Sequence, residues 1–150
     1  MSVPKIPRAK SPWASQLFGA RSTVTAGTQV GSAIPVTVQL KDENGKNLAQ
    51  IAVVDVYLSG VAGATAIVGT APTGGVAAGA SGAVLAAVVA GKYLRCVTDA
   101  AGKLILTLTD SGTPTFYAAA VMPDGSVVVS AAITFTAAST TTSTTTTTAP

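Results

Sequence analysis

The residue types that most often carry catalysis or bind metals are scarce in this sequence. There is no histidine and only one cysteine, Cys96, among 150 residues. Histidine is the commonest general base and metal ligand near neutral pH, and one thiol forms neither an internal disulfide nor a thiolate cluster. Six scattered carboxylates remain: Asp42, Glu43, Asp55, Asp99, Asp110 and Asp124. They lack the spacing of a calcium loop, so we predict no catalytic residue, no metal, no cofactor and no enzyme activity.

Glycine-rich stretches and basic clusters are the other places where a ligand is commonly held. Gly74, Gly75 and Gly79 are not followed by the lysine and hydroxyl residue of a phosphate-binding loop. Basic residues cluster only near the N-terminus, and the predicted strands lack interleaved basic and aromatic residues. We therefore expect no nucleotide and no nucleic-acid partner. Cys96 lies in an apolar run, which predicts a buried, inert side chain.

Charge is unusually sparse along the chain. Charged residues make up 10% of the sequence, and none occurs in residues 56–91. Glycines and Pro72 interrupt that uncharged segment, so it does not predict a membrane-spanning helix. A surface with few charges offers little resistance to self-association. The composition therefore predicts a protein made in the cytosol, not bound to a membrane, that packs against neighbours, including further copies of itself.

The first 21 residues form a separate, basic segment. They carry Lys5, Arg8, Lys10 and Arg21 without any acidic residue, which leaves five basic and six acidic residues in the remainder. Prolines at positions 4, 7 and 12 favour an extended chain. The apolar residues of this arm either pack back on the domain, stay free in solution, or dock on a partner protein. On the docking interpretation, the partner-contact residues are Lys5, Arg8, Lys10, Trp13, Leu17, Phe18 and Arg21.

Residues 22–138 predict a single antiparallel β-sandwich. Apolar and polar residues alternate in residues 34–40, 53–58 and 103–109, as expected for strands with one buried face. Further short strands are expected at 23–25, 66–68, 84–89, 93–97, 115–121 and 127–135. Roughly seven to nine such strands, separated by glycine, proline and aspartate turns, indicate an all-β sandwich.

The last twelve residues, 139–150, are a low-complexity segment with eight threonines. Such a segment has too little apolar surface to order itself, so we expect a disordered, solvated tail. Glycosylation, or a strand-like stalk formed where several copies gather, are the alternatives.

Tyr117 is the most informative single residue for the fold. It follows a glycine and proline turn at residues 110–114 and enters a predicted strand. In immunoglobulin-like sandwiches a tyrosine at this place, the tyrosine corner, donates its hydroxyl hydrogen bond to main chain a few residues upstream. On this interpretation Tyr117 bonds to residues 110–113; the alternative is that Tyr117 is an ordinary half-buried strand residue.

These stretches carry a resemblance to a known group of proteins. Residues 36–45 (VTVQLKDENG), 98–109 (TDAAGKLILTLT) and 115–135 resemble immunoglobulin-like structural proteins of tailed-bacteriophage virions, of the capsid decoration or cement type. The resemblance spans roughly residues 22–136 and implies an immunoglobulin-like module without catalytic residues. It implies a structural virion protein whose partner is the major capsid protein or another shell protein. A tail or head–tail connector subunit, or a module that binds host-surface carbohydrate, are the alternatives.

Overall fold

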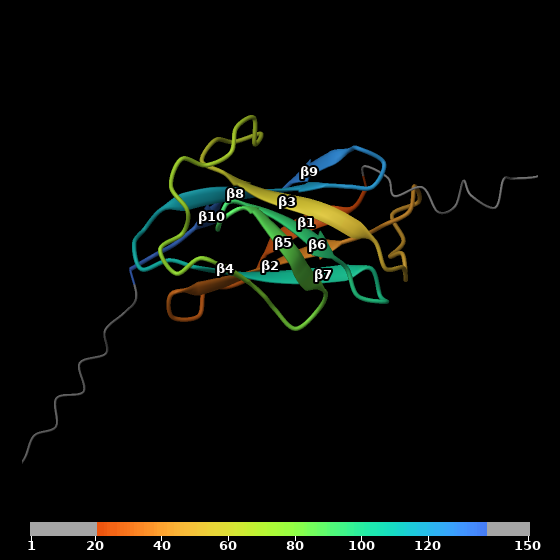
Figure 1. Ribbon diagram of the computed structural model, residues 1–150, viewed down its shortest axis with the longest axis horizontal. Helices are drawn as coiled ribbons and strands as arrows, with labels where there is room; N and C mark the ends of the chain where they lie inside the picture. Colours follow the sequence, from red (N-terminus) through yellow and green to blue (C-terminus); the bar gives the residue numbers. More distant parts are fainter. Residues whose placement is uncertain (1–20, 138–150) are drawn as a thin grey trace, which may run out of the picture.

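The computed structural model describes residues 21–137. In the long strands of this part of the chain, side chains point alternately into the core and outward. Ten strands in two layers form a β-sandwich, and these residues contain no helix (Figure 1). The strands are β1 (Thr23–Ala26), β2 (Ala33–Gln39), β3 (Val53–Ser59), β4 (Val76–Ala78), β5 (Ala83–Val89), β6 (Tyr93–Val97), β7 (Lys103–Thr109), β8 (Thr115–Val121), β9 (Val127–Val129) and β10 (Ile133–Thr134). The predicted all-β fold class is confirmed. The predicted arm up to residue 20 and the predicted threonine-rich tail lie outside the described residues.

The strand order is that of an immunoglobulin-like sandwich with one rearrangement. Sheet one has the order β1-β2-β7-β4, and sheet two has the order β10-β8-β3-β6-β5 with β9 also on β8, all pairs being antiparallel. The first three strands of the immunoglobulin fold and its last two correspond to β1, β2, β3, β8 and β9–β10. The β5–β6 hairpin extends sheet two beyond β3, but in the chain it follows β4.

The core lies between the two sheets and consists of the alternate residues of the long strands. Val36 and Val38 of β2 pair with Leu106 and Leu104 of β7, and all four are at most 1% exposed. Sheet two contributes the inward residues Val54, Val56, Leu58, Leu94, Cys96, Phe116, Ala118 and Ala120. The rings of Phe116 and Phe135 meet edge to face at 6.1 Å. Burial of this apolar area supplies most of the driving force for folding.

The segment from β4 to β5 passes from sheet one to sheet two. Gly79 N donates a hydrogen bond to Ile105 O at 2.7 Å, and a Cβ at Gly79 would lie 2.6 Å from Ile105 Cγ2. Gly82 has a φ of +73°, and a Cβ there would lie 2.5 Å from Val97 O. Glycine is needed at both positions because the main chain crosses between the sheets at close approach to other strands.

Two strand predictions are wrong. Residues 66–68 form no strand; Val68 N donates a hydrogen bond to Leu58 O at 2.7 Å. The strand found between β3 and β5 is β4, which pairs with the edge of β7 that β2 does not occupy. The predicted strand 127–135 is divided into β9 and β10. At the division, Ser130 Oγ accepts a hydrogen bond from Ala118 N at 3.0 Å, while Ser130 N donates to Ala118 O at 2.8 Å. The serine hydroxyl replaces a main-chain carbonyl there, so the strand pairing is interrupted.

Candidate interaction site

Polar and aromatic side chains gather on the outer face of sheet two. The register pairs Asp55 with Arg95 and Tyr57 with Tyr93, so these four residues of β3 and β6 share one face. They alternate with Val54, Val56, Leu94 and Cys96, which face the core. Directly opposed residues on one face of an antiparallel pair are close enough to interact. The strand register therefore assembles a site from two segments about 40 residues apart in the sequence.

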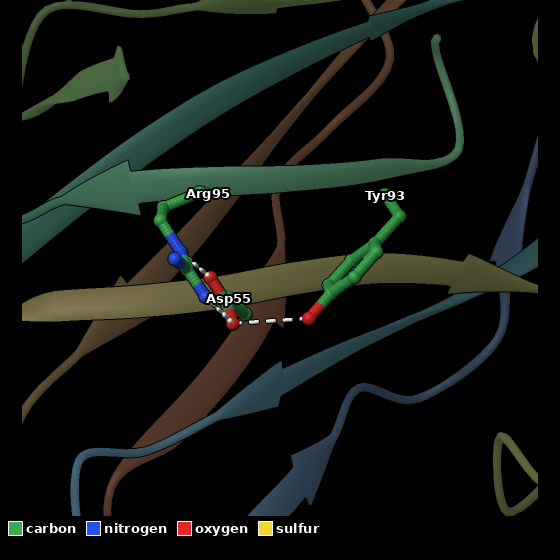
Figure 2. A network of polar contacts seen from close by, with 3 residues as sticks. All are labelled: Asp55, Tyr93 and Arg95. Atoms are coloured by element: carbon green, nitrogen blue, oxygen red, sulfur yellow. Dashed lines mark hydrogen bonds and ion pairs between the residues drawn. The ribbon is translucent and has the colours of Figure 1, made fainter. Parts of the chain in front are cut away.

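Asp55 is the centre of a hydrogen-bonded network (Figure 2). Arg95 donates from Nε to Asp55 Oδ1 at 2.9 Å and from Nη2 to Oδ2 at 3.0 Å, and Tyr93 Oη donates to Oδ2 at 3.0 Å. The hydrogen bonds from Arg95 lower the pKa of Asp55; burial opposes this shift, and the hydrogen bond from Tyr93 adds to it. The same bonds to Asp55 raise the pKa of Arg95 and of Tyr93. The carboxylate is thus held ionised, and its ion pair with Arg95 is the one found within residues 21–137.

The tyrosines on this face are fixed by their neighbours. The rings of Tyr57 and Tyr93 meet edge to face at 6.2 Å and 84°. Tyr57 Oη donates a hydrogen bond of 2.8 Å to Ala64 O, in the loop that follows β3. Ala64 has a φ of 53° and is buried, so the loop is held against the sheet at this point. The outer face of sheet two therefore presents the partly covered rings of Tyr57 and Tyr93 beside the Asp55–Arg95 ion pair.

Tyr117 lies on the same outer face, opposite Ser59, but the tyrosine-corner prediction is not met. Among the described residues, no hydrogen bond joins its hydroxyl to residues 110–113. The buried Asp110 organises that turn instead, because its Oδ1 accepts from Gly112 N at 2.7 Å and its Oδ2 from Thr73 N at 2.8 Å. The turn is thus held by a carboxylate that accepts hydrogen bonds from main-chain N–H groups, without the hydrogen bond that the tyrosine hydroxyl was expected to donate.

Exposed apolar side chains are concentrated in sheet two. Nine large apolar residues are well exposed: Val30, Ile51, Val53, Val61, Ile67, Leu85, Val88, Val89 and Val127. Five of them lie in strands β3, β5 and β9 of sheet two, and none lies in a strand of sheet one. Strand β5, with the sequence AVLAAVV, forms the edge of sheet two, and every residue in it except Val84 is exposed. An uncharged apolar edge of this kind favours contact with another protein.

The outer face of sheet one is polar by comparison. Its outward positions include the threonines Thr23, Thr25, Thr37, Thr107 and Thr109, together with Gln39 and Lys103. Thr37 pairs with both Thr25 and Ile105, which places a hydroxyl row across β1 and β2. Threonine suits an exposed strand face because its branched Cβ fits the pleat while its hydroxyl meets water.

The residues predicted to contact a partner are mostly beyond the described part of the chain. Lys5, Arg8, Lys10, Trp13, Leu17 and Phe18 lie outside it, so their predicted role stays a prediction. Arg21 is described and exposed. Asp55, Tyr93 and Arg95 were not among the predicted site residues. The signal that would have found them is their shared outward position in the strand sequences VVDVYL and YLRCV.

Potential metal ligands and the single thiol of the described residues are not arranged as a site. No group of three or more potential metal ligands occurs within residues 21–137. Cys96 is buried as predicted, and burial raises the pKa of its thiol to about 11. A thiol with so high a pKa is a poor nucleophile near neutral pH.

In the described region, no helix has the length and hydropathy to cross a bilayer. The outer face of sheet two is suited to binding through apolar and aromatic contacts with one charged pair.

Comparisons with known proteins give a likeness in structure alone. No family model and no curated protein matches the sequence. Among solved structures, the chain is similar to the D00–D0 domain of Intimin. The two share 19% of their residues with a TM-score of 0.43, over 75% of this chain and 45% of that one. The immunoglobulin-like assignment rests on the strand order described above.

Proposed function

We propose that this chain is a non-enzymatic structural protein of an assembled particle, of the decoration or cement type found on tailed-phage capsids. The observation that carries the proposal is the exposed apolar surface of sheet two, formed by β5, Val53 and Val127 beside the Asp55–Arg95 ion pair. A free monomer gains nothing from such a surface, whereas a subunit packed against neighbours buries it. Each buried square ångström of apolar surface then stabilises the assembly by roughly 25 cal/mol.

The N-terminal arm gives the proposal its attachment mechanism. Lys5, Arg8 and Lys10 precede any acidic residue in the sequence and would pair with acidic groups of a shell protein. Trp13, Leu17 and Phe18 would supply the apolar anchors, because aromatic residues contribute most to binding at interfaces. The near-neutral sandwich would then lie on the shell surface and contact further copies of itself.

The test is the loading of particles by arm variants. The full chain, a chain lacking residues 1–20, and two full-length variants would be produced with the particle that carries the protein. One variant replaces Lys5, Arg8 and Lys10 by alanine, and the other replaces Trp13, Leu17 and Phe18. Copies per purified particle would be counted by mass spectrometry. We expect loss of most copies without the arm and partial loss in each variant. Normal loading without residues 1–20 would contradict the proposed attachment, and location in the tail would move the protein to the tail or connector class.

A module that binds host-surface carbohydrate is the second candidate, and one observation favours it. Tyr57, Tyr93 and Tyr117 share the outer face of sheet two with Asp55 and Arg95, which places aromatic rings beside hydrogen-bonding groups. Sugars bind such combinations through stacking and polar contacts. A glycan array probed with the full chain and with Tyr93→Ala tests this candidate. Binding that Tyr93→Ala abolishes would support it, and an array without signal would remove it.

A further inference from the structure

An open groove lies between β1 and β10, where the edges of the two sheets meet. It has a volume of about 420 Å³ and is lined by residues 24–27, Gln29, Ile34 and residues 131–134. The lining includes the buried side chains of Val24, Ile34 and Ile133 and has no charged residue. Ala26 belongs to the core-facing row of β1, two residues after Val24, yet it is exposed. The inward row of β1 is therefore uncovered at this end of the sandwich.

The β1 side of the groove is an unpaired strand edge. Gly27 N donates to Pro35 O at 2.7 Å, which places Gly27 at a position hydrogen-bonded to β2. In an antiparallel pair these positions alternate along the strand. The main-chain N–H and C=O groups of Val24 and Ala26 therefore point away from β2, toward the groove.

The β10 side has the same character. Phe135 N donates to Pro114 O at 3.0 Å, so the main-chain groups of Thr134 and Thr136, one residue to each side, point away from β8. At Thr136 the side chain of Gln29 takes the place of a neighbouring strand. Its Oε1 accepts from Thr136 N at 2.8 Å, and its Nε2 donates to Thr136 O at 2.9 Å. Within residues 21–137, no side chain or strand forms hydrogen bonds with the main-chain N–H and C=O of Thr134, further along this edge. An extended segment in the groove could form those bonds and so continue the pairing that Gln29 makes at Thr136.

We propose that this groove binds residues 13–18 of the N-terminal arm of a second copy of this chain, as an added β-strand. This inference rests on the proposed function of the arm as a docking segment, and it names the partner of the arm's apolar half. Residues 13–18 (WASQLF) lie between Pro12 and Gly19 and contain neither proline nor charge, so they can pair on both edges of an uncharged groove. In an extended strand Trp13 and Leu17 project to the same side, toward the apolar lining.

The entry of the chain into β1 favours a second copy over the same chain. Ser22 is buried, and its Oγ accepts a hydrogen bond from Lys41 N at 3.1 Å. A Cβ at Gly45 would lie 4.0 Å from Arg21 Cδ, so Arg21 is beside the 41–46 turn. The groove begins at Val24 and extends away from that turn. An arm returning to its own groove would need a hairpin loop at residues 19–23 that includes Ser22, which is already held by Lys41 N, whereas the arm of a neighbour has no such connection to β1.

Disulfide trapping between two full-length variants tests the proposal. Leu17→Cys, carrying a purification tag, would be mixed with untagged Ala132→Cys under mild oxidation. We expect a cross-linked pair of tagged and untagged chains. The buried Cys96 does not compete. The matched control mixes Leu17→Cys with Thr37→Cys, on the outer face of sheet one, and should give no cross-link above background. Equal yields from both mixtures would overturn the proposal. So would a chain carrying both Leu17→Cys and Ala132→Cys that closes on itself in dilute solution while the mixture gives nothing.

A blocking substitution separates this inference from the proposed function. Ala26→Arg, added to the Ala132→Cys chain, places a cation in the uncharged groove and should lower the cross-linked yield about tenfold or more. Thr37→Arg, on the outer face of sheet one and outside the groove lining, should leave the yield unchanged. An unchanged yield with Ala26→Arg would overturn the groove as the binding site. Particle loading that fails while the cross-link forms would overturn the proposed function alone.

Discussion

The two sheets of this sandwich have similar inner faces and different outer faces. Inward, β2 and β7 bury valine and leucine as completely as β3 and β6 do. Outward, sheet one presents threonines, whereas sheet two presents valines, tyrosines and one ion pair. Burial of the inner faces is needed for folding, so their likeness is expected. The outer faces have no such constraint, and their difference is the reason for placing the proposed contacts with other molecules on sheet two.

Truncation of the inner faces should have the largest effect and should affect both sheets alike. We expect Leu106→Ala in sheet one and Leu58→Ala in sheet two each to lower the free energy of unfolding by about 2–5 kcal/mol, because each leaves a cavity. Urea titration followed by circular dichroism measures both. The outward control Thr107→Ala should change stability by about 0.5 kcal/mol or less. A much smaller loss in one sheet would show that the two halves of the core are not equivalent.

Charges placed on the two outer faces should separate them in self-association. Val53→Lys combined with Val127→Lys should weaken contact between copies about tenfold, through repulsion and lost apolar burial. Thr37→Lys combined with Thr107→Lys adds the same charge to sheet one and should leave association unchanged. Sedimentation velocity over a concentration series measures both. A larger loss of association from the two sheet-one substitutions than from the two sheet-two substitutions would show that copies contact each other through sheet one, and would contradict the assignment to sheet two.

The ion pair of sheet two should make stability depend on pH. Asp55→Asn should cost about 1 kcal/mol or less near pH 7, since Arg95 is more than half exposed and water screens the pair. The folded-state pKa of Asp55 lies below its ordinary value of 3.8, so its stabilisation is present above that pH and is lost as pH falls through the folded value. The stability gap between the wild type and Asp55→Asn should therefore close in acid. The untitratable variant Thr37→Ala should keep a constant gap.

Converting one outer residue of sheet two to the type found in sheet one should have the smallest effect on stability. Val127→Thr should change the free energy of unfolding by about 0.5 kcal/mol or less, because Val127 is 49% exposed. Retention on a hydrophobic column and binding of an apolar dye should nevertheless fall. Retention unchanged by Val127→Thr would show that the exposed valine is not part of the adhesive surface.

Local alternation was sufficient to predict most strands but not their partners. The strand expected at 34–40 is found at Ala33–Gln39, and the one expected at 103–109 is found there. Residues 66–68 form no strand, and the strand that pairs with the free edge of β7 is Val76–Ala78, which was not predicted. Which segment pairs with a distant strand edge is decided in the folded chain and leaves no local pattern.

The candidate site at Asp55, Tyr93 and Arg95 was not predicted because it also depends on pairing between distant strands. The outward position of Asp55 was clear from alternation, but its pairing with Arg95 depends on the register between β3 and β6. The strands at 84–89 and 93–97 were predicted, but the pairing of the second one with β3 was not. The sequence pattern of a tyrosine corner was present at Tyr117, but the hydrogen bonds that hold the turn at residues 110–114 are made by the side chain of Asp110. Short-range patterns predicted the elements, and long-range pairing determined the site.

The connection from β4 in sheet one to β5 in sheet two should make the two sheets unfold together. Residues 79–82 alone connect β4 of sheet one to β5 of sheet two, so the sheets cannot move far apart while both strands stay paired. Hydrogen exchange should therefore report one global opening event for the amides of β2, β3, β6 and β7, with closely similar protection in both layers. The sandwich should resist proteases and partial melting as a single cooperative unit.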